Sequence, residues 1–120
     1  MGEDLVEIKD LDLKERCLLA FSTHDYNKVS EIVLPLAESG VAWAKTALGT
    51  LYYLGLGVDQ NLGKAEECFL EAYAEKDELA LINLISLYQY MGRLEDVNRL
   101  TAEASNRELE FYSKPNDPSK

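Results

Sequence analysis

The sequence predicts an all-α protein made of stacked helical hairpins. The main observation is an internal repeat, in which four residues of one segment return with the same identities 36 positions later. They are Ala44, Leu48, Leu51 and Tyr52, and then Ala80, Leu84, Leu87 and Tyr88. A repeat of this length is typical of arrays in which each helical hairpin buries its apolar face only against its neighbours. The second observation is the length of 120 residues, which gives room for three hairpins and for no catalytic domain beside them.

We therefore expect one domain over residues 1–112, with antiparallel hairpins at about 11–38, 41–75 and 77–112. The final run SKPNDPSK, residues 113–120, predicts a disordered tail. The N-terminal acids leave three possibilities open: a surface for a basic partner, a solvated face, or an unstructured acidic arm. These acids are Glu3, Asp4, Glu7, Asp10 and Asp12.

The first hairpin combines two segments with apolar residues at helical spacing. Residues 11–22 form its first arm and residues 25–38 its second, with Asp25 as the expected cap between them. Pro35 interrupts the second arm. Because an interior proline removes a backbone hydrogen bond and costs roughly 3 kcal/mol, we expect a kink or a break near residues 31–34.

The remaining helices have clear start and stop signals. They are expected over residues 41–54, 61–75, 77–91 and 94–112. Asn61 and Asp77 are good N-caps, and glycines at 55, 57 and 92 suit the turns that follow the third and fifth helices. The sixth helix has a polar outer face, which suits the last helix of an array.

Composition and charge limit the classes of function. The chain is 47 % hydrophobic, but its apolar runs are only a few residues long, which predicts no membrane span. Acids outnumber bases 22 to 12, for a net charge of −10, so nucleic-acid binding is not expected. This charge favours a basic protein partner or serves solubility alone, and both interpretations stay open. The acidic start has no signal-peptide pattern, which predicts a cytoplasmic protein.

A longer motif in the second hairpin resembles a known repeat family. It reads Ala44-x3-Leu48-Gly49-x2-Tyr52-x2-Gly55-x-Gly57-Val58, then Lys64-Ala65-x3-Phe69-x2-Ala72 and Ala80. This run is similar to the Sel-one-like repeat, a variant of the tetratricopeptide repeat. The resemblance implies a right-handed superhelix of three antiparallel hairpins, a protein or peptide partner on the concave face, and no catalysis.

The outer copies depart from the Sel-one-like pattern. Tyr88 precedes Val97 by nine residues, whereas Tyr52 precedes Ala65 by thirteen, so the third hairpin resembles an ordinary tetratricopeptide repeat with a short loop. The first hairpin has the same short spacing. Lys76 stands where the family usually has glycine.

The resemblance also implies which side chains line the concave face. They are Lys14, Leu18 and Phe21 in the first hairpin, Trp43, Thr46, Thr50 and Tyr53 in the second, and Ile82, Ser86, Gln89 and Tyr90 in the third. Large aromatic residues with a polar group are favoured at protein-binding centres. For Phe21 and Trp43 the alternative is packing between neighbouring first helices.

No residue pattern indicates catalysis, a cofactor or a metal. The Gly55-x-Gly57 pair lacks the third glycine of a dinucleotide-binding loop, and His24 has no metal-ligand cluster or nucleophile beside it. Cys17 and Cys68 show no metal or redox spacing, which predicts buried free thiols.

The outer helix of the second hairpin carries an acidic row. Glu67, Glu71 and Glu75 follow at intervals of four residues, where like charges repel slightly. The row favours a basic partner or is a solvated convex face.

Together these features predict a non-enzymatic interaction module, an adaptor that binds one protein or peptide partner on its concave face. The alternative is an immunity-type inhibitor that neutralises a toxin or effector protein.

Overall fold

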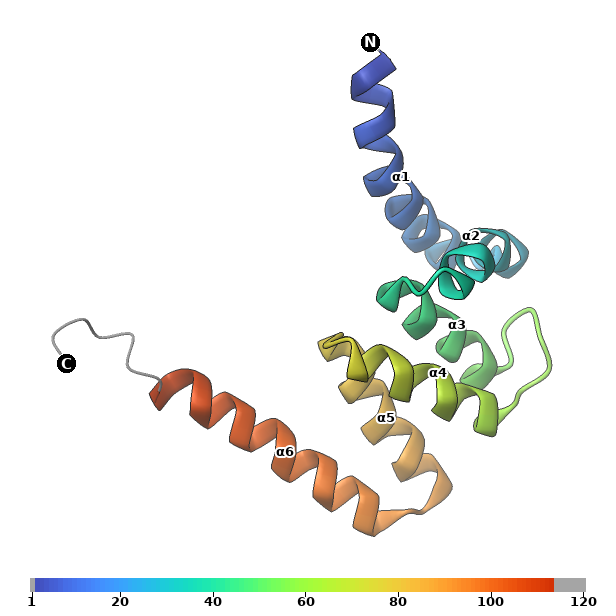
Figure 1. Cartoon of the computed structure of the whole chain (residues 1–120). Helices are drawn as coiled ribbons and strands as arrows, with labels where there is room; N and C mark the ends of the chain where they lie inside the picture. The colour runs from blue at the N-terminus through green and yellow to red at the C-terminus, as the bar shows by residue number, and fades with distance from the viewer. Residues whose placement is uncertain (1, 114–120) are drawn as a thin grey trace, which may run out of the picture.

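The structure is a computed structural model that describes the backbone of residues 2–113 and the side chains of residues 12–107 (Figure 1). It contains α1 (Gly2–Ser22), α2 (Tyr26–Glu38), α3 (Ala42–Leu54), α4 (Leu62–Ala74), α5 (Glu78–Met91) and α6 (Leu94–Ser113). No strand occurs within residues 2–113. The prediction of an all-α fold is therefore confirmed.

Each helix packs against the next along the chain. In addition, α3 contacts α5, the helix two positions on. The described structure measures 47 × 43 × 24 Å, and its shortest dimension is about two helix diameters. Figure 1 shows that the N-terminal part of α1 and the C-terminal part of α6 extend away from the other helices.

The structure differs from two expectations about the first two helices, the start of the first helix and the break at Pro35. The helix predicted over residues 11–22 begins at Gly2, so the acidic N-terminal residues are helical rather than an unstructured arm. Helix α2 also runs without a break through Pro35. Pro35 and Glu31 are both exposed, so water can solvate the Glu31 carbonyl that proline leaves without a donor. The apolar side of α2, with Val29 and Val33 fully buried, favours the continuous helix.

A disordered tail was predicted over residues 113–120, but Ser113 is still part of α6. Residues 114–120 lie outside the described residues.

The turns follow the predicted caps. Asp25, Asn61 and Asp77 each accept a hydrogen bond from a backbone N–H of the helix that they precede. The turn after α4 places Lys76 at φ +72°, a left-handed conformation that disfavours a Cβ. This is the position where the Sel-one-like pattern has glycine.

Two groups of buried residues form the core. The first joins α1, α2 and α3 and consists of Cys17, Ala20, Val29, Ile32, Val33, Ala37, Ala44 and Leu51. The second joins α4, α5 and α6 and consists of Ala65, Phe69, Leu81, Leu84, Leu87, Tyr88 and Leu100. A Cβ at Gly49 would lie 2.6 Å from Cε1 of Phe69, so this glycine permits the close approach of α3 and α4.

A polar cluster lies where α4, α5 and the start of α6 meet. The Tyr88 hydroxyl donates to Oε2 of Glu66 at 2.6 Å, and the Arg93 guanidinium lies 4.3 Å from the Tyr88 ring centroid. Arg93 also pairs with Glu66 at 3.1 Å and with Asp96 at 2.8 Å. Burial, followed by the hydrogen bond to Glu66, raises the pKa of Tyr88 to about 12.

Candidate interaction surface

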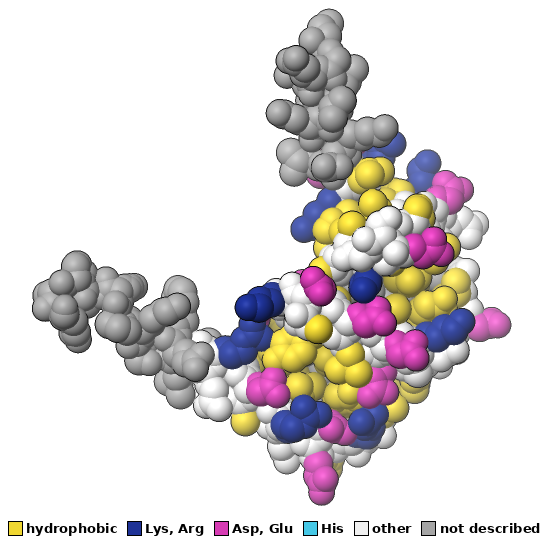
Figure 2. All heavy atoms as spheres, viewed as in Figure 1, with side chains coloured by type: hydrophobic (Ala, Val, Ile, Leu, Met, Phe, Trp, Pro, Cys, Tyr) yellow, Lys and Arg dark blue, Asp and Glu magenta, His cyan; other side chains and the backbone are white. Residues whose placement is uncertain are grey.

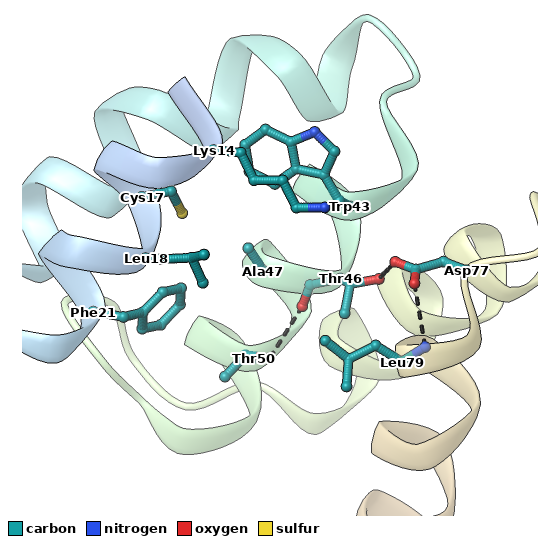
Figure 3. Close-up of a pocket in the computed structure, with 10 residues that line it drawn as sticks. All are labelled: Lys14, Cys17, Leu18, Phe21, Trp43, Thr46, Ala47, Thr50, Asp77 and Leu79. Atoms are coloured by element: carbon teal, nitrogen blue, oxygen red, sulfur yellow. Dashed lines mark hydrogen bonds between the residues drawn. The ribbon is translucent and has the colours of Figure 1, made fainter. Parts of the chain in front are cut away.

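A hollow of about 440 Å³ lies between α1, α3 and the first turn of α5 (Figure 3). Six of the residues predicted for the concave face line it: Lys14, Leu18, Phe21, Trp43, Thr46 and Thr50. The other lining residues are Cys17, Ala47, Asp77 and Leu79. Residues from three helices, far apart in the sequence, thus form one site.

The walls of the hollow are largely apolar. Leu18 of α1 and Leu79 of α5 expose 61 % and 55 % of their surface, a large fraction for leucine in a folded chain. Trp43 is half-buried, and the Lys14 ammonium lies 5.8 Å from the centroid of its ring. Cys17 is buried, and burial raises the pKa of its thiol, so the sulfur remains protonated at neutral pH.

At the α5 end, the polar groups of the hollow already have partners. The Thr46 hydroxyl donates to Oδ2 of Asp77 at 2.6 Å. The other carboxylate oxygen, Oδ1, accepts the Leu79 backbone N–H at 3.2 Å and so caps α5 (Figure 3). Asp77 therefore serves both as the helix cap and as a link between α3 and α5.

A second link joins α3 and α5 further along. The Tyr53 hydroxyl donates to the Ser86 carbonyl oxygen at 3.2 Å. Its ring makes edge-to-face contacts with Phe69 and Tyr90, at centroid distances of 6.5 and 5.8 Å. Tyr53 is half-buried by these contacts between helices, and it does not line the hollow.

The other predicted residues on α5 lie outside the hollow. Ile82 and Tyr90 expose 60 % and 62 % of their surface, Gln89 is exposed, and Ser86 is half-buried beneath the Tyr53 hydroxyl. Together with Leu79 they form an uncharged stripe along α5, which starts at the hollow.

The contact between α1 and α3 is more open than that between α3 and α5. Within the described residues, no Cα of α1 lies within 8 Å of a Cα of α3, and no hydrogen bond joins these two helices. The positions equivalent to the linking residues explain this. Phe21 stands where Tyr53 stands one hairpin later and has no hydroxyl, while Lys14 and Val41 replace the Thr46 and Asp77 pair.

The acidic row lies away from the hollow. Glu67, Glu71 and Glu75 are exposed on or just after α4, and Glu71 pairs with Lys45 of α3 at 3.2 Å. Figure 2 shows acidic and basic side chains interspersed over the face that includes α4. The row is therefore partly neutralised by the chain's own lysine.

Four lining residues were not predicted. Leu79 follows Trp43 by 36 residues, so the repeat itself contained the signal that would have identified it. Asp77 was predicted only as a cap, and no sequence signal indicates its bond to Thr46. Cys17 was predicted as a buried thiol and Ala47 was given no role; both line the hollow, Cys17 as part of the first core group and Ala47 packed against it.

The structure also shows where the residues that could bind a metal or act as nucleophiles lie. Among the described residues, no group of three His, Cys, Asp or Glu could hold a metal ion. Both cysteines are free thiols; Cys17 is buried as predicted, but Cys68 is only half-buried. Nδ1 of His24 lies 2.7 Å from the Tyr26 hydroxyl, at the turn between α1 and α2.

Within the described residues, no helix is long and apolar enough to span a membrane. Comparisons with protein-family models, with curated proteins and with solved structures found no match.

Proposed function

We propose that this chain is a non-enzymatic protein-interaction module that holds a protein or peptide partner along the face formed by α1, α3 and α5. The observation that carries the proposal is the solvent-open apolar hollow, with Leu18, Trp43 and Leu79 around it. Exposed apolar surface of this kind is costly in water and marks interaction sites. The uncharged stripe on α5 extends the same surface.

The proposal includes a short right-handed superhelix of the tetratricopeptide type. It is supported by the 36-residue repeat, by the contacts between successive helices, and by the additional contact of α3 with α5. In such an array the first helix of each hairpin contributes to one continuous surface. The six predicted residues that share the hollow fit that arrangement.

Site-specific photo-crosslinking in cells of the source organism tests this function. A photoreactive amino acid at Leu18, on the hollow, is compared with one at Leu70, which is 45 % exposed on α4. We expect a discrete crosslinked protein, identified by mass spectrometry, from position 18 and not from position 70. Crosslinks from position 70 alone would move the binding surface to the outer face, and crosslinks from neither position would count against an interaction module.

A further inference from the structure

The hollow lies between α1 and α3, where the described residues form no equivalent of the two hydrogen bonds that join α3 to α5. Thr46 bonds to Asp77, and Tyr53 bonds to the Ser86 carbonyl. The equivalent groups between α1 and α3 are a lysine, a valine and a phenylalanine, which cannot form these bonds. Phe21 has the ring of a tyrosine but no hydroxyl to bond to a carbonyl, and it lines the hollow.

We propose that the hollow is the anchor pocket for one large uncharged side chain, aliphatic or aromatic, carried by a peptide segment of the partner protein. This inference rests on the proposed function and specifies the chemistry of the partner at the contact. The α5 stripe then contacts the neighbouring residues of the same segment, with Ile82 and Tyr90 as its most exposed apolar members.

The volume of the hollow suits such an anchor. An apolar cavity of about 150 Å³ is enough to bind benzene. The hollow measures about 440 Å³, so a phenyl or isobutyl group fits with room for part of the backbone that carries it. A bulky side chain inserted here would contact Leu18, Phe21 and Trp43 and remove their apolar surface from water.

The charges around the hollow argue for an uncharged segment. At one end the Lys14 ammonium repels a basic side chain. At the other end both oxygens of the Asp77 carboxylate already accept hydrogen bonds, from Thr46 and from Leu79. A lysine or arginine of the partner would lose its hydration against the apolar walls and could pair only with a carboxylate that already accepts two hydrogen bonds, which is less favourable than burying an uncharged side chain.

The neighbouring charges on α3 and α5 are also neutralised. Lys45, the sole charged residue of α3, pairs with Glu71. Glu78, the sole charged residue of α5, bonds to Arg107 of α6. The net charge of −10 is thus carried by other surfaces, and the contact itself is apolar. This favours solubility over a basic partner as the reason for the acidic composition.

Random peptides can serve as probes of the hollow before the partner protein is identified. A phage-displayed library of random dodecapeptides is panned against the full chain, and the enriched peptides are synthesised. We expect sequences that share a Leu, Met or Phe with no Lys or Arg beside it. For tryptophan-free peptides, binding should shift the emission of Trp43, which is the chain's single tryptophan and lines the hollow.

A matched pair of variants locates the site. Leu18 and Leu19 are adjacent on α1 and expose 61 % and 62 % of their surface, but Leu18 alone lines the hollow. Leu18→Glu should weaken the peptides tenfold or more, and Leu19→Glu less than twofold. Circular dichroism checks that both variants fold, and Leu79→Glu provides a second variant of the hollow.

Two results would overturn the anchor pocket while leaving peptide binding intact. One is enrichment of Lys- or Arg-rich peptides whose affinity falls steeply with salt. The other is equal binding by the Leu18, Leu19 and Leu79 variants. A library that yields no peptide above background would count against the proposed function as well.

Discussion

Helices α3 and α5 are joined by two side-chain hydrogen bonds and an aromatic cluster, whereas α1 and α3 enclose a solvent-open hollow. The positions compared are equivalent in the repeat, and the helices have the same order along the chain. The difference comes from a few residues: Tyr53 against Phe21, and the Thr46 and Asp77 pair against Lys14 and Val41. In this chain, therefore, the repeat accounts for the helices. The residues at equivalent positions differ between the pair of helices that is joined by hydrogen bonds and the pair that encloses the hollow.

The largest effect is expected from removing a core residue of α5, the helix that is hydrogen-bonded to α3. Tyr88 is 2 % exposed and occupies the position that Ala20 holds in the first hairpin. Tyr88→Ala should lower the free energy of unfolding by about 3–5 kcal/mol, because it empties core space and leaves Arg93 without its stacking partner. Urea unfolding measures the change. Tyr52→Ala should cost less because Tyr52 is half-buried, and unchanged stability in both variants would show that the repeat register is wrong.

A smaller effect is expected from breaking one link between α3 and α5. Thr46→Val keeps the shape of the side chain but removes the hydroxyl that donates to Asp77. Since hydrogen bonds to charged groups contribute about 1.5–3 kcal/mol, we expect a loss within that range. Thr50→Val is the matched control, because the Thr50 hydroxyl bonds only to the Thr46 carbonyl of its own helix. Equal losses in the two variants would mean that the bond to Asp77 adds no stability.

The smallest expected effect concerns alkaline pH. Burial and the Glu66 hydrogen bond raise the pKa of Tyr88 to about 12, against about 10 for an unfolded tyrosine. The folded state therefore retains a proton that the unfolded state loses, and the stabilisation present below pH 10 disappears as the pH rises to about 12. The melting temperature should fall over this range by a few degrees more in the wild type than in Tyr88→Phe.

The exposed Tyr90 provides the control for this titration. Tyr90→Phe should melt like the wild type at each pH, because Tyr90 is 62 % exposed. If Tyr88→Phe and the wild type lose stability in parallel between pH 10 and 12, the hydroxyl of Tyr88 is not linked to folding.

Local signals were enough to predict most of the helices. Asp25, Asn61 and Asp77 cap helices as expected, since capping depends on a side chain and the backbone two or three residues away. The break expected near Pro35 does not occur, because the local penalty of proline competes with the burial of Val29 and Val33, which a propensity does not include. The start of the first helix was placed too late because residues 2–10 have no strong apolar periodicity from which a helix could be predicted.

The candidate site was only partly predictable. Periodicity and the family resemblance together identified six residues of the hollow, but not that α1 and α3 would separate while α3 and α5 would touch. That distinction depends on a bond between Thr46 and Asp77, 31 residues apart, and on a tyrosine hydroxyl reaching a backbone carbonyl. Neither contact has a signature in the sequence.

The hollow also has a mechanical consequence. Helices α1 and α2 are held to the rest of the molecule through the contact of α2 with α3, whereas α5 is held by both α3 and α4. A load applied across the array would therefore pass through the contact of α2 with α3, because within the described residues no hydrogen bond joins α1 to α3. A ligand that fills the hollow would contact α1 and α3 at once and so add a second connection between them. Occupancy of the hollow should then raise the rupture force in single-molecule pulling.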